Sequence, residues 1–279
     1  MKSFHRRTSR PAPSAPAPVA APVLRPGLQR VDSLLVEQGL AASRTLAQRL
    51  IAAGRVQAEG EPVSKPALVL PATTRLTVSA DDADRYVSRG GLKLAGALEE
   101  TGLQVQGRDC LDIGQSTGGF SDCLLQAGAR RVVGVDVGHG QLHPRLQGDP
   151  RIVALEGINC RHLCLADLGE SWPTAGFDLI VGDVSFISLT LILPQLPPLL
   201  AADGDMVLLV KPQFELGPQA LGKGGVVRDA ADYAEVEQRL RRAAAECGLT
   251  VRHWFPSPLI GGGVGHIAGN REFFIWLRT

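Results

Sequence analysis

Four charged residues stand where chemistry could reach them, at the ends of apolar runs or beside glycines. Lys93 lies in SRGGLKL, Asp183 ends LIVGD, Lys211 ends MVLLVK and Glu272 opens REFFIWLR. Individually they have ordinary interpretations, as a helix lysine, a helix cap, a strand-end charge and an edge residue. Together, lysines set between carboxylates can hold a hydroxyl group in line with an electrophilic methyl group. We therefore take Lys93, Asp183, Lys211 and Glu272 as candidate catalytic residues.

A glycine-rich turn follows the apolar run that ends at Ile113. In LDIGQSTGGF, Gly114 follows a predicted strand and Gly118–Gly119 opens a predicted helix, where free backbone N–H groups can meet a ligand. Asp136 lies 22 positions after Gly114, at the end of the next strand, where a carboxylate can accept from ribose hydroxyls. The alternative is a plain strand–turn–helix junction with a capping acid. The acid at the strand end favours an adenosine ligand.

The amino-acid sequence of the turn distinguishes between two adenosine-containing cofactors. It reads G-x-S-T-G-G and not G-x-G-x-x-G, so a pyrophosphate cradle is missing and NAD is the weaker candidate. S-adenosylmethionine, which carries adenosine and an amino acid but no phosphate, fits better. We expect its ribose at Asp136, its adenine at the next strand end, and its methionine part near the turn and Asp183. The candidate cofactor-binding residues are Asp112, Gly114, Ser116, Thr117, Gly118, Gly119, Phe120, Asp136, Glu156, Asn159 and Asp183.

The elements that must position these residues are short apolar strands alternating with helical stretches. CLDIG, RVVGVDVG, RIVALEG, FDLIVGDVSF and DMVLLVKPQF are near-continuous Val, Ile and Leu runs, typical of a parallel sheet covered on both faces. Helices are predicted between them at 119–127, 187–200 and 231–247. The fold class is therefore α/β, a Rossmann-like doubly wound sheet with ligands at the carboxyl ends of its strands. REFFIWLR follows no helix, which predicts a hairpin-paired antiparallel strand.

The first third of the chain differs in composition and charge. Residues 1–90 carry 13 Lys/Arg against 7 Asp/Glu, whereas the rest carries 16 against 21. Residues 1–27 form an Arg-, Pro- and Ala-rich arm that cannot build a core and is expected to be disordered. Residues 28–84 predict two short helices and a few short strands, 85–90 a linker, and 91–279 the sheet domain. A basic front part of this kind favours a polyanionic partner.

Several other classes of protein are disfavoured. The five cysteines are odd in number and sit mostly in apolar surroundings, so we expect reduced thiols of a cytoplasmic protein and no disulfide framework. Cys160 and Cys164 have no second pair at ligand spacing, so no metal site is expected. No run approaches the roughly 18–20 apolar residues needed to span a bilayer, and no secretory signal is present.

The motifs SRGGLKL, LDIGQSTGGF, VDVGHGQL, GDVSFISL, KPQFE, KGGVVRD and GNREFF resemble those of the TlyA family of FtsJ-like ribosomal RNA 2′-O-methyltransferases. RVDSLLVEQGLAASRTLAQRLIAAGRVQAEGEPVSKP is similar to the S4 RNA-binding domain that this family carries. The resemblance spans residues 28–278. It implies that Lys93, Asp183, Lys211 and Glu272 match the family's Lys-Asp-Lys-Glu tetrad, and it supports S-adenosylmethionine as the cofactor.

The resemblance also implies a substrate, ribose 2′-hydroxyl groups of ribosomal RNA or of a ribosomal subunit, with cytidine as the expected nucleotide. The RNA-binding candidates are Arg44, Arg49, Arg55, Lys65 and Arg89, with Arg6, Arg7, Arg10 and Arg25 in the arm. The sequence departs from the family at Gln115 and His139, where Ala and Tyr are expected, and in the long loop 261–269 before Glu272. The sequence does not predict an oligomeric state.

Two alternative functions of other classes stay open at this point. Relatives are often labelled haemolysins, but a membrane-active protein needs an exposed amphipathic lytic segment, and none is found in the sequence. An RNA-binding protein with an inactive sheet domain is opposed by the complete set of Lys93, Asp183, Lys211 and Glu272.

Overall fold

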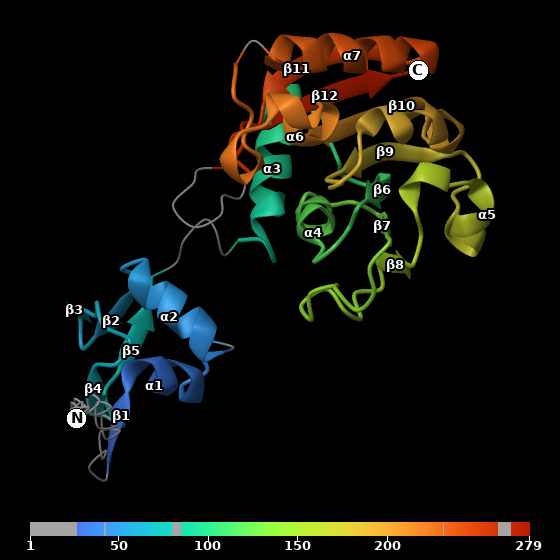
Figure 1. Cartoon of the computed structure of the whole chain (residues 1–279). Helices are drawn as coiled ribbons and strands as arrows, with labels where there is room; N and C mark the ends of the chain where they lie inside the picture. Colours follow the sequence, from blue (N-terminus) through green and yellow to red (C-terminus); the bar gives the residue numbers. More distant parts are fainter. Residues whose placement is uncertain (1–26, 42, 80–84, 231, 262–268) are drawn as a thin grey trace, which may run out of the picture. The chain divides into compact units, whose positions relative to one another are not determined.

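The computed structural model describes residues 27–41, 43–79, 85–230, 232–261 and 269–279. The chain divides into two compact units, residues 1–80 and 81–279, each with its own apolar core (Figure 1). The expected arm, apart from Gly27, and most of the loop 261–269 lie outside the described residues. The expected boundary at 84–85 adjoins residues that are also outside them, so it stays a prediction.

The first unit packs two short helices against short strands. Its core contains Val31, Leu34 and Leu35 of the first helix and Leu50 and Ile51 of the second, all 7% exposed or less. The second helix is capped at its N-terminus, since the Ser43 hydroxyl accepts from the backbone N–H of Leu46 at 3.2 Å. The elements are β1 (Leu28–Arg30), α1 (Val31–Glu37), α2 (Arg44–Ala52), β2 (Val56–Ala58), β3 (Glu61–Pro62), β4 (Val69–Pro71) and β5 (Leu76–Val78).

The second unit is built on a seven-stranded sheet in the order β11-β12-β10-β9-β6-β7-β8. The five strands from β10 to β8 are parallel, while β12 runs antiparallel to both β10 and β11. The predicted parallel sheet and the antiparallel final strand are confirmed. The strands are β6 (Asp109–Ile113), β7 (Arg131–Asp136), β8 (Ile152–Glu156), β9 (Phe177–Gly182), β10 (Leu200–Val210), β11 (Thr250–Pro256) and β12 (Phe273–Arg278).

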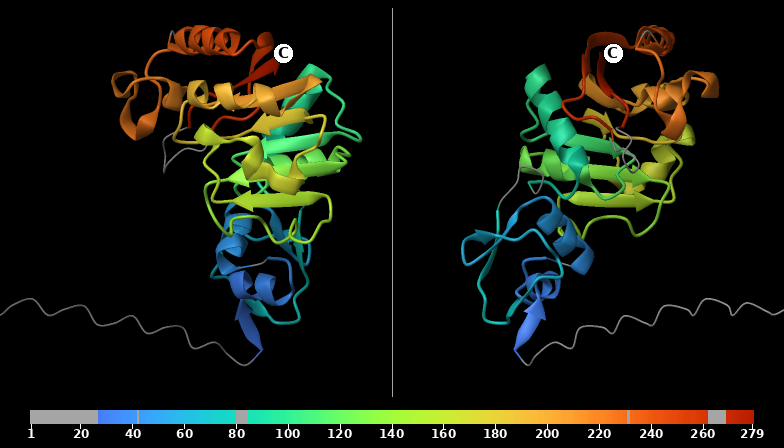
Figure 2. Two further views of the ribbon diagram at one scale, coloured as in Figure 1. Left: turned by 90° about the vertical axis from the view of Figure 1, so that its right-hand side faces the viewer. Right: turned by 60° about the vertical axis from the view of Figure 1, so that its left-hand side comes forward.

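Two apolar layers cover the sheet, one on each face (Figures 1 and 2). Strand residues alternate between them, so that Leu179 and Val181 face one layer and Ile180 faces the other. Helices α3 (Arg89–Thr101) and α4 (Gly119–Gln126) cover the first face, and α7 (Asp232–Glu246) with several short helical turns covers the second.

One predicted helix is wrong. Residues 187–200 form three 3₁₀ turns, η4 (Leu189–Leu191), η5 (Leu193–Gln195) and η6 (Pro197–Leu199), and Leu200 already belongs to β10. Pro194, Pro197 and Pro198 explain the difference, because proline cannot donate the backbone hydrogen bond that a continuous α-helix needs. Most apolar residues of the segment are still buried against the second face, as the hydrophobic pattern indicated, although Leu191 is exposed.

The strand order places a crevice in the middle of the sheet. From β6 the chain continues to β7 and β8 on one side, and it then crosses to β9 on the other side of β6. Ligands of doubly wound sheets bind outside the strands at the point where the strand order reverses in this way. Gly114 follows β6 and Asp183 follows β9, and the backbone N–H of Asp183 donates to the Ile113 carbonyl at 3.1 Å. The two motifs are therefore brought together by the sheet itself.

Candidate active site

The glycine turn between β6 and α4 passes close to the end of β9. Gly114 and Gly118 have φ angles of 78° and 89°, in the left-handed region that favours glycine. A Cβ atom on Gly114 would lie 3.2 Å from the Asp183 carbonyl oxygen, and one on Gly118 would lie 2.5 Å from a methyl group of Leu146. Glycine is required at both positions by conformation and by space.

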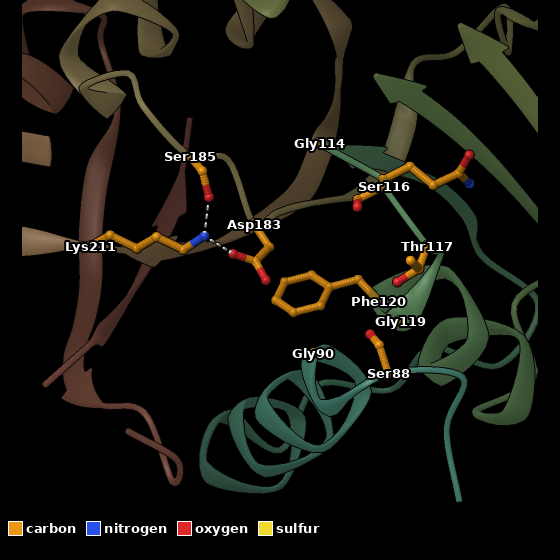
Figure 3. A pocket seen from close by; sticks show the side chains of 11 residues that line it. Ser88, Gly90, Gly114, Ser116, Thr117, Gly119, Phe120, Asp183, Ser185 and Lys211 are labelled. Atoms are coloured by element: carbon orange, nitrogen blue, oxygen red, sulfur yellow. Dashed lines mark hydrogen bonds and ion pairs between the residues drawn. The ribbon is translucent and has the colours of Figure 1, made fainter. Parts of the chain in front are cut away.

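Two cavities open on the two sides of this turn. The smaller, of about 220 Å³, also touches the start of α3 and two of the catalytic candidates, Asp183 and Lys211 (Figure 3). Its lining residues include Ser88, Gly90, Thr117, Phe120, Ser185 and Lys211. The larger, of about 480 Å³, has an apolar wall formed by Val137, Ile158, Ile187 and Ile192 and a polar side formed by Asp136 and Asn159. Gly114, Ser116, Asp183 and Ser185 line both cavities.

Asp136 organises the turn from the end of β7, as its position in the sequence predicted. Its Oδ2 accepts from the backbone N–H of Ser116 at 2.8 Å, and its Oδ1 accepts from that of Gly138 at 2.7 Å. The Ser116 hydroxyl donates in turn to Gln141 at 3.0 Å. Each carboxylate oxygen can accept a further hydrogen bond, so Asp136 can hold hydroxyl groups of a ligand in the larger cavity.

The structure does not support direct contact with a cofactor for Asp112. This side chain is fully buried behind the turn, where its Oδ2 accepts from the Ser121 hydroxyl at 2.7 Å. The Ser121 oxygen accepts from the Gln115 amide at 2.8 Å, so three side chains form a buried chain. Burial raises the pKa of the Asp112 carboxyl group to about 7. Direct contact of Asp112 with a cofactor stays a prediction, because a strand covered on both faces has no sequence pattern that separates inward-facing from ligand-facing residues.

Two other expected cofactor residues line neither cavity. Gly118 opens α4 and packs under Leu146, so its role is to shape the turn. The Glu156 carboxylate accepts from the backbone N–H of Gly140 at 2.7 Å and fixes the loop that follows β7. Direct contact of these two residues with a ligand stays a prediction.

The four catalytic candidates form two short ion pairs. Lys211 Nζ lies 2.6 Å from Asp183 Oδ1, and Lys93 Nζ lies 2.6 Å from Glu272 Oε2. All four side chains are at least three-quarters buried. The pairs are linked through α3, since a Cβ atom on Gly90 would lie 3.7 Å from Asp183 Oδ2 and Lys93 follows one turn later. Both are short ion pairs, and the Lys211–Asp183 pair lines the smaller cavity.

Sequence reasoning missed two residues beside Lys211. Lys211 also donates to the Ser185 hydroxyl at 2.6 Å (Figure 3). Phe186 follows with a φ angle of 64° and a 90% exposed ring that lies 5.1 Å from the ring of Phe214. A non-glycine residue in the left-handed region costs about 1–3 kcal/mol and persists only when neighbouring structure holds it. The signal available in the sequence was a Ser-Phe pair two residues after a strand-end acid.

The expected RNA-binding side chains have different surroundings. Arg44 donates to the buried carboxylate of Asp32 at 2.9 Å, and Arg55 donates to the Ser79 carbonyl, so both also have structural partners. Arg49 and Lys65 are exposed on the first unit. In the second unit Arg89 donates to the Ile260 carbonyl at 3.1 Å. RNA contact stays a prediction for all five residues.

Metal centres and membrane-spanning helices are two other classes of feature that bear on function. Within the described ranges, no group of three or more His, Cys, Asp or Glu side chains is placed to hold a metal ion. None of the described helices combines the length and the apolar character that a membrane crossing requires.

Comparisons with known proteins match both units. Residues 86–279 match the FtsJ-like methyltransferase model, and residues 29–75 match the S4 domain model. The 16S/23S rRNA (cytidine-2′-O)-methyltransferase TlyA of Mycobacterium tuberculosis is 47% identical over 250 residues, which cover 90% of each chain. Hemolysin A of Brachyspira hyodysenteriae is 37% identical over 88% of this chain and all of its own.

A solved structure extends the match to three dimensions. A Streptococcus thermophilus protein superposes with a TM-score of 0.67 at 40% identity, covering 90% of this chain and 88% of that one. The family models together span nearly all of residues 29–279. This chain therefore belongs to the TlyA family, in which an S4 domain precedes an FtsJ-like methyltransferase domain.

Proposed function

We propose that this chain transfers the methyl group of S-adenosylmethionine to a ribose 2′-hydroxyl group of ribosomal RNA, in the cytoplasm. The observation that carries the proposal is the position of Lys211, whose Nζ contacts Asp183 and Ser185 where the two cavities meet. The name of the Mycobacterium tuberculosis relative supports cytidine as the nucleotide. The S4 domain supports RNA as the partner.

The residues around the turn fit S-adenosylmethionine. The apolar wall of the larger cavity suits adenine, and Asp136 suits the ribose hydroxyls. The smaller cavity is lined by Ser88, Thr117 and the start of two helices, where polar groups and free backbone N–H groups can hold the amino-acid part. When bound, this cofactor supplies a methyl group on a positively charged sulfur.

The side chains of this protein act mainly by positioning. Alignment of reacting groups can contribute about 7–11 kcal/mol, whereas general base catalysis contributes about 10²–10⁴-fold in rate. Lys211 has three N–H donors: one is directed to Ser185, the ammonium group pairs with Asp183, and a free N–H can hold the acceptor oxygen. Asp183 orients Lys211, and Lys93 with Glu272 completes the charged wall.

RNA is the acceptor that this arrangement favours, because only RNA carries a 2′-hydroxyl. A target nucleotide must leave its stack to reach a recessed site, and proteins stabilise such bases on aromatic rings. Phe186 provides an exposed ring three residues after Asp183, supported by Phe214. We therefore assign Phe186 to the base of the acceptor nucleotide.

The test is transfer of radioactive methyl groups to ribosomal subunits and to RNA and DNA oligonucleotides of one sequence. The intact chain is expected to label RNA alone, at a 2′-oxygen that mapping identifies. Lys211→Ala should abolish transfer and leave cofactor affinity, measured by calorimetry, within a few-fold, because Lys211 contacts the acceptor side. Arg241→Ala, which breaks an exposed ion pair with Glu237, is the matched control and should retain full activity.

Other outcomes would replace the proposal. A large loss of cofactor affinity in Lys211→Ala would move Lys211 from the acceptor to the cofactor. Thermal stabilisation by NAD and not by S-adenosylmethionine would reassign the larger cavity. Dye release from vesicles by the protein alone, without methyl transfer, would favour the activity named for the Brachyspira hyodysenteriae relative.

A further inference from the structure

The segment that follows β9 and the segment that follows β10 carry the two residues of the Asp183–Lys211 ion pair, and they are joined at two points. One carries Asp183 and Ser185 after β9, and the other carries Lys211 after β10. The first junction is Lys211 itself, which donates to the Ser185 hydroxyl at 2.6 Å and forms an ion pair with Asp183 at 2.6 Å. The second lies four residues along α6 (Pro212–Glu215), where the Glu215 carboxylate receives two hydrogen bonds from the β9 side.

Glu215 makes a buried junction between these segments. Its Oε2 accepts from the Ser188 hydroxyl at 2.5 Å, and its Oε1 accepts from the backbone N–H of Leu189 at 2.7 Å. Only 3% of the residue is exposed, so both carboxylate oxygens are shielded from water and depend on these hydrogen-bond partners. Arg239 of α7 donates to the backbone carbonyl of Glu215 and fastens α6 to the rest of the unit. A buried carboxylate of this kind keeps its neighbours in one arrangement.

Ser185 contributes a different interaction from that of Asp183. Its hydroxyl is a neutral acceptor for Lys211, so it fixes the direction of the ammonium group without adding a second charge. The ion pair with Asp183 and the hydrogen bond to Ser185 together place the ammonium group, which leaves N–H donors of Lys211 for the acceptor oxygen. Both residues line the two cavities, so the acceptor oxygen would lie where the cavities meet (Figure 3).

We propose that Ser185 and Glu215 are positioning residues for methyl transfer: Ser185 orients Lys211 directly, and Glu215 holds the Ser185 segment against the Lys211 segment. This inference rests on the proposed function for its effect on rate. The strained backbone of Phe186 lies between the two junctions, at Ser185 and at Ser188, which supply the support that such a conformation needs.

The kinetic test measures kcat and KM for RNA at saturating cofactor. Ser185→Ala is expected to lower kcat by up to about 100-fold, since a misplacement of about 1 Å can cost that much, with cofactor affinity within a few-fold. Ser185→Thr keeps the hydroxyl and should recover most of the rate. Ser171→Ala, in a half-buried serine that lines neither cavity, is the matched control.

Glu215 is tested by two variants, because loss of a buried carboxylate can prevent folding. Glu215→Gln keeps the shape of the side chain, and Ser188→Ala removes one of the two donors while the bond from the Leu189 N–H to Glu215 remains. Both should lower kcat several-fold while the midpoint of thermal unfolding of the full chain stays near that of the intact protein. A positioning role would be overturned if the fall in kcat only paralleled the fall in thermal stability. It would also be overturned if KM for RNA rose and cofactor affinity fell by the same factor as kcat.

A second readout does not depend on activity. Lys211 should react slowly with acetic anhydride relative to the exposed Lys223, as measured by mass spectrometry in the same sample. Ser185→Ala and Glu215→Gln should each raise the relative rate several-fold by releasing the amine. Unchanged labelling would overturn the proposal even if the enzyme is active. Inactivity of the intact chain on RNA with the predicted labelling would instead contradict the proposed function and keep the positioning contacts.

Discussion

At the scale of single residues, Gln115 and Gly134 form a matched pair beneath the cofactor turn. Gln115 is 6% exposed and donates to Ser121, and a Cβ atom on Gly134 would lie 1.9 Å from its amide nitrogen. The absence of a side chain at position 134 is therefore what admits the glutamine. This pair anchors the turn to β7 from below, while Asp136 holds it from the open side.

We expect Gln115→Ala to weaken the turn and Gly134→Ala to displace the glutamine. Each should destabilise the protein by about 1–3 kcal/mol, because Ser121 loses a buried partner or the packing clashes. The double variant should recover part of the loss, since alanine at 134 fills space that glutamine leaves. Calorimetry should show weaker cofactor binding in both single variants. Strictly additive losses in the double variant would show that the two positions do not share this space.

Asp112 predicts a pH dependence of stability. Burial raises the pKa of its carboxyl group from 3.8 to about 7, so the folded protein holds a proton that the unfolded chain releases. Between these two values the free energy of unfolding should therefore fall as pH rises, by at most about 1.4 kcal/mol per pH unit from this group.

Urea titrations of the intact protein and of Asp112→Asn isolate this contribution. The asparagine carries no titratable group, so the stability of the variant relative to the intact protein should rise with pH and level off near 7. Other shifted groups, such as Asp205 and Glu215, are common to both proteins and cancel in the difference. Parallel pH profiles would mean that Asp112 titrates at its ordinary value.

At the scale of elements, the start of β12 is placed by the loops around it. Asn270, 7% exposed, accepts from the backbone N–H of Val227 and donates to the Gly225 carbonyl, which ties the 221–228 segment to this strand. Gly261 donates its N–H to the Asn270 carbonyl, and a Cβ atom on Gly261 would lie 2.6 Å from Glu272 Oε1. The Glu272 carboxylate thus reaches Lys93 because position 261 has no side chain.

Gly261→Ala is accordingly expected to separate Glu272 from Lys93. Methyl transfer should fall by at least about 10-fold through misplacement, while cofactor affinity changes little because neither residue lines the cofactor cavity. The control is Gly222→Ala, where an added Cβ atom would meet its nearest neighbour at 3.4 Å. If both variants keep full activity, the ion pair is not needed for the reaction.

The elements also show how far sequence reasoning reached. The parallel strands and the acidic residues at their carboxyl ends, Asp136 and Asp183, could be predicted because each is a local pattern in the sequence. The edge strand β11 and the pairing of Lys93 with Glu272 could not, because they depend on contacts between residues far apart in the chain. The 187–200 segment was wrongly predicted as one helix because the hydrophobic pattern does not register its prolines, and the burial of Asp112 was not predicted because β6 is covered on both faces.

At the scale of the whole molecule, the two units carry different features. The first has its own core and carries the excess of basic residues, and the second carries both cavities and the ion pairs. Neither core cluster of the second unit includes a residue of the first among those described. We therefore expect RNA affinity and cofactor affinity to be separable by mutation.

The variant Arg49→Glu with Lys65→Glu tests this separation in the full chain. Both side chains are exposed on the first unit, so their reversal should leave cofactor affinity and thermal stability nearly unchanged while RNA binding weakens. If Arg49 and Lys65 each pair with a phosphate, the slope of log affinity against log salt should decrease by about one for each of these two charges. Binding is measured by fluorescence anisotropy over a range of salt concentrations.

The control variant is Arg241→Glu with Arg242→Glu, at two exposed positions of α7. It changes the net charge of the protein by the same amount as Arg49→Glu with Lys65→Glu. Because long-range attraction depends on total charge, this control separates a bulk effect from specific phosphate contacts. The α7 variant should bind RNA with nearly the salt slope of the intact protein. Equal slopes in the two variants would mean that RNA responds to overall charge, and the first unit would then lose its assignment as the dedicated RNA-binding unit.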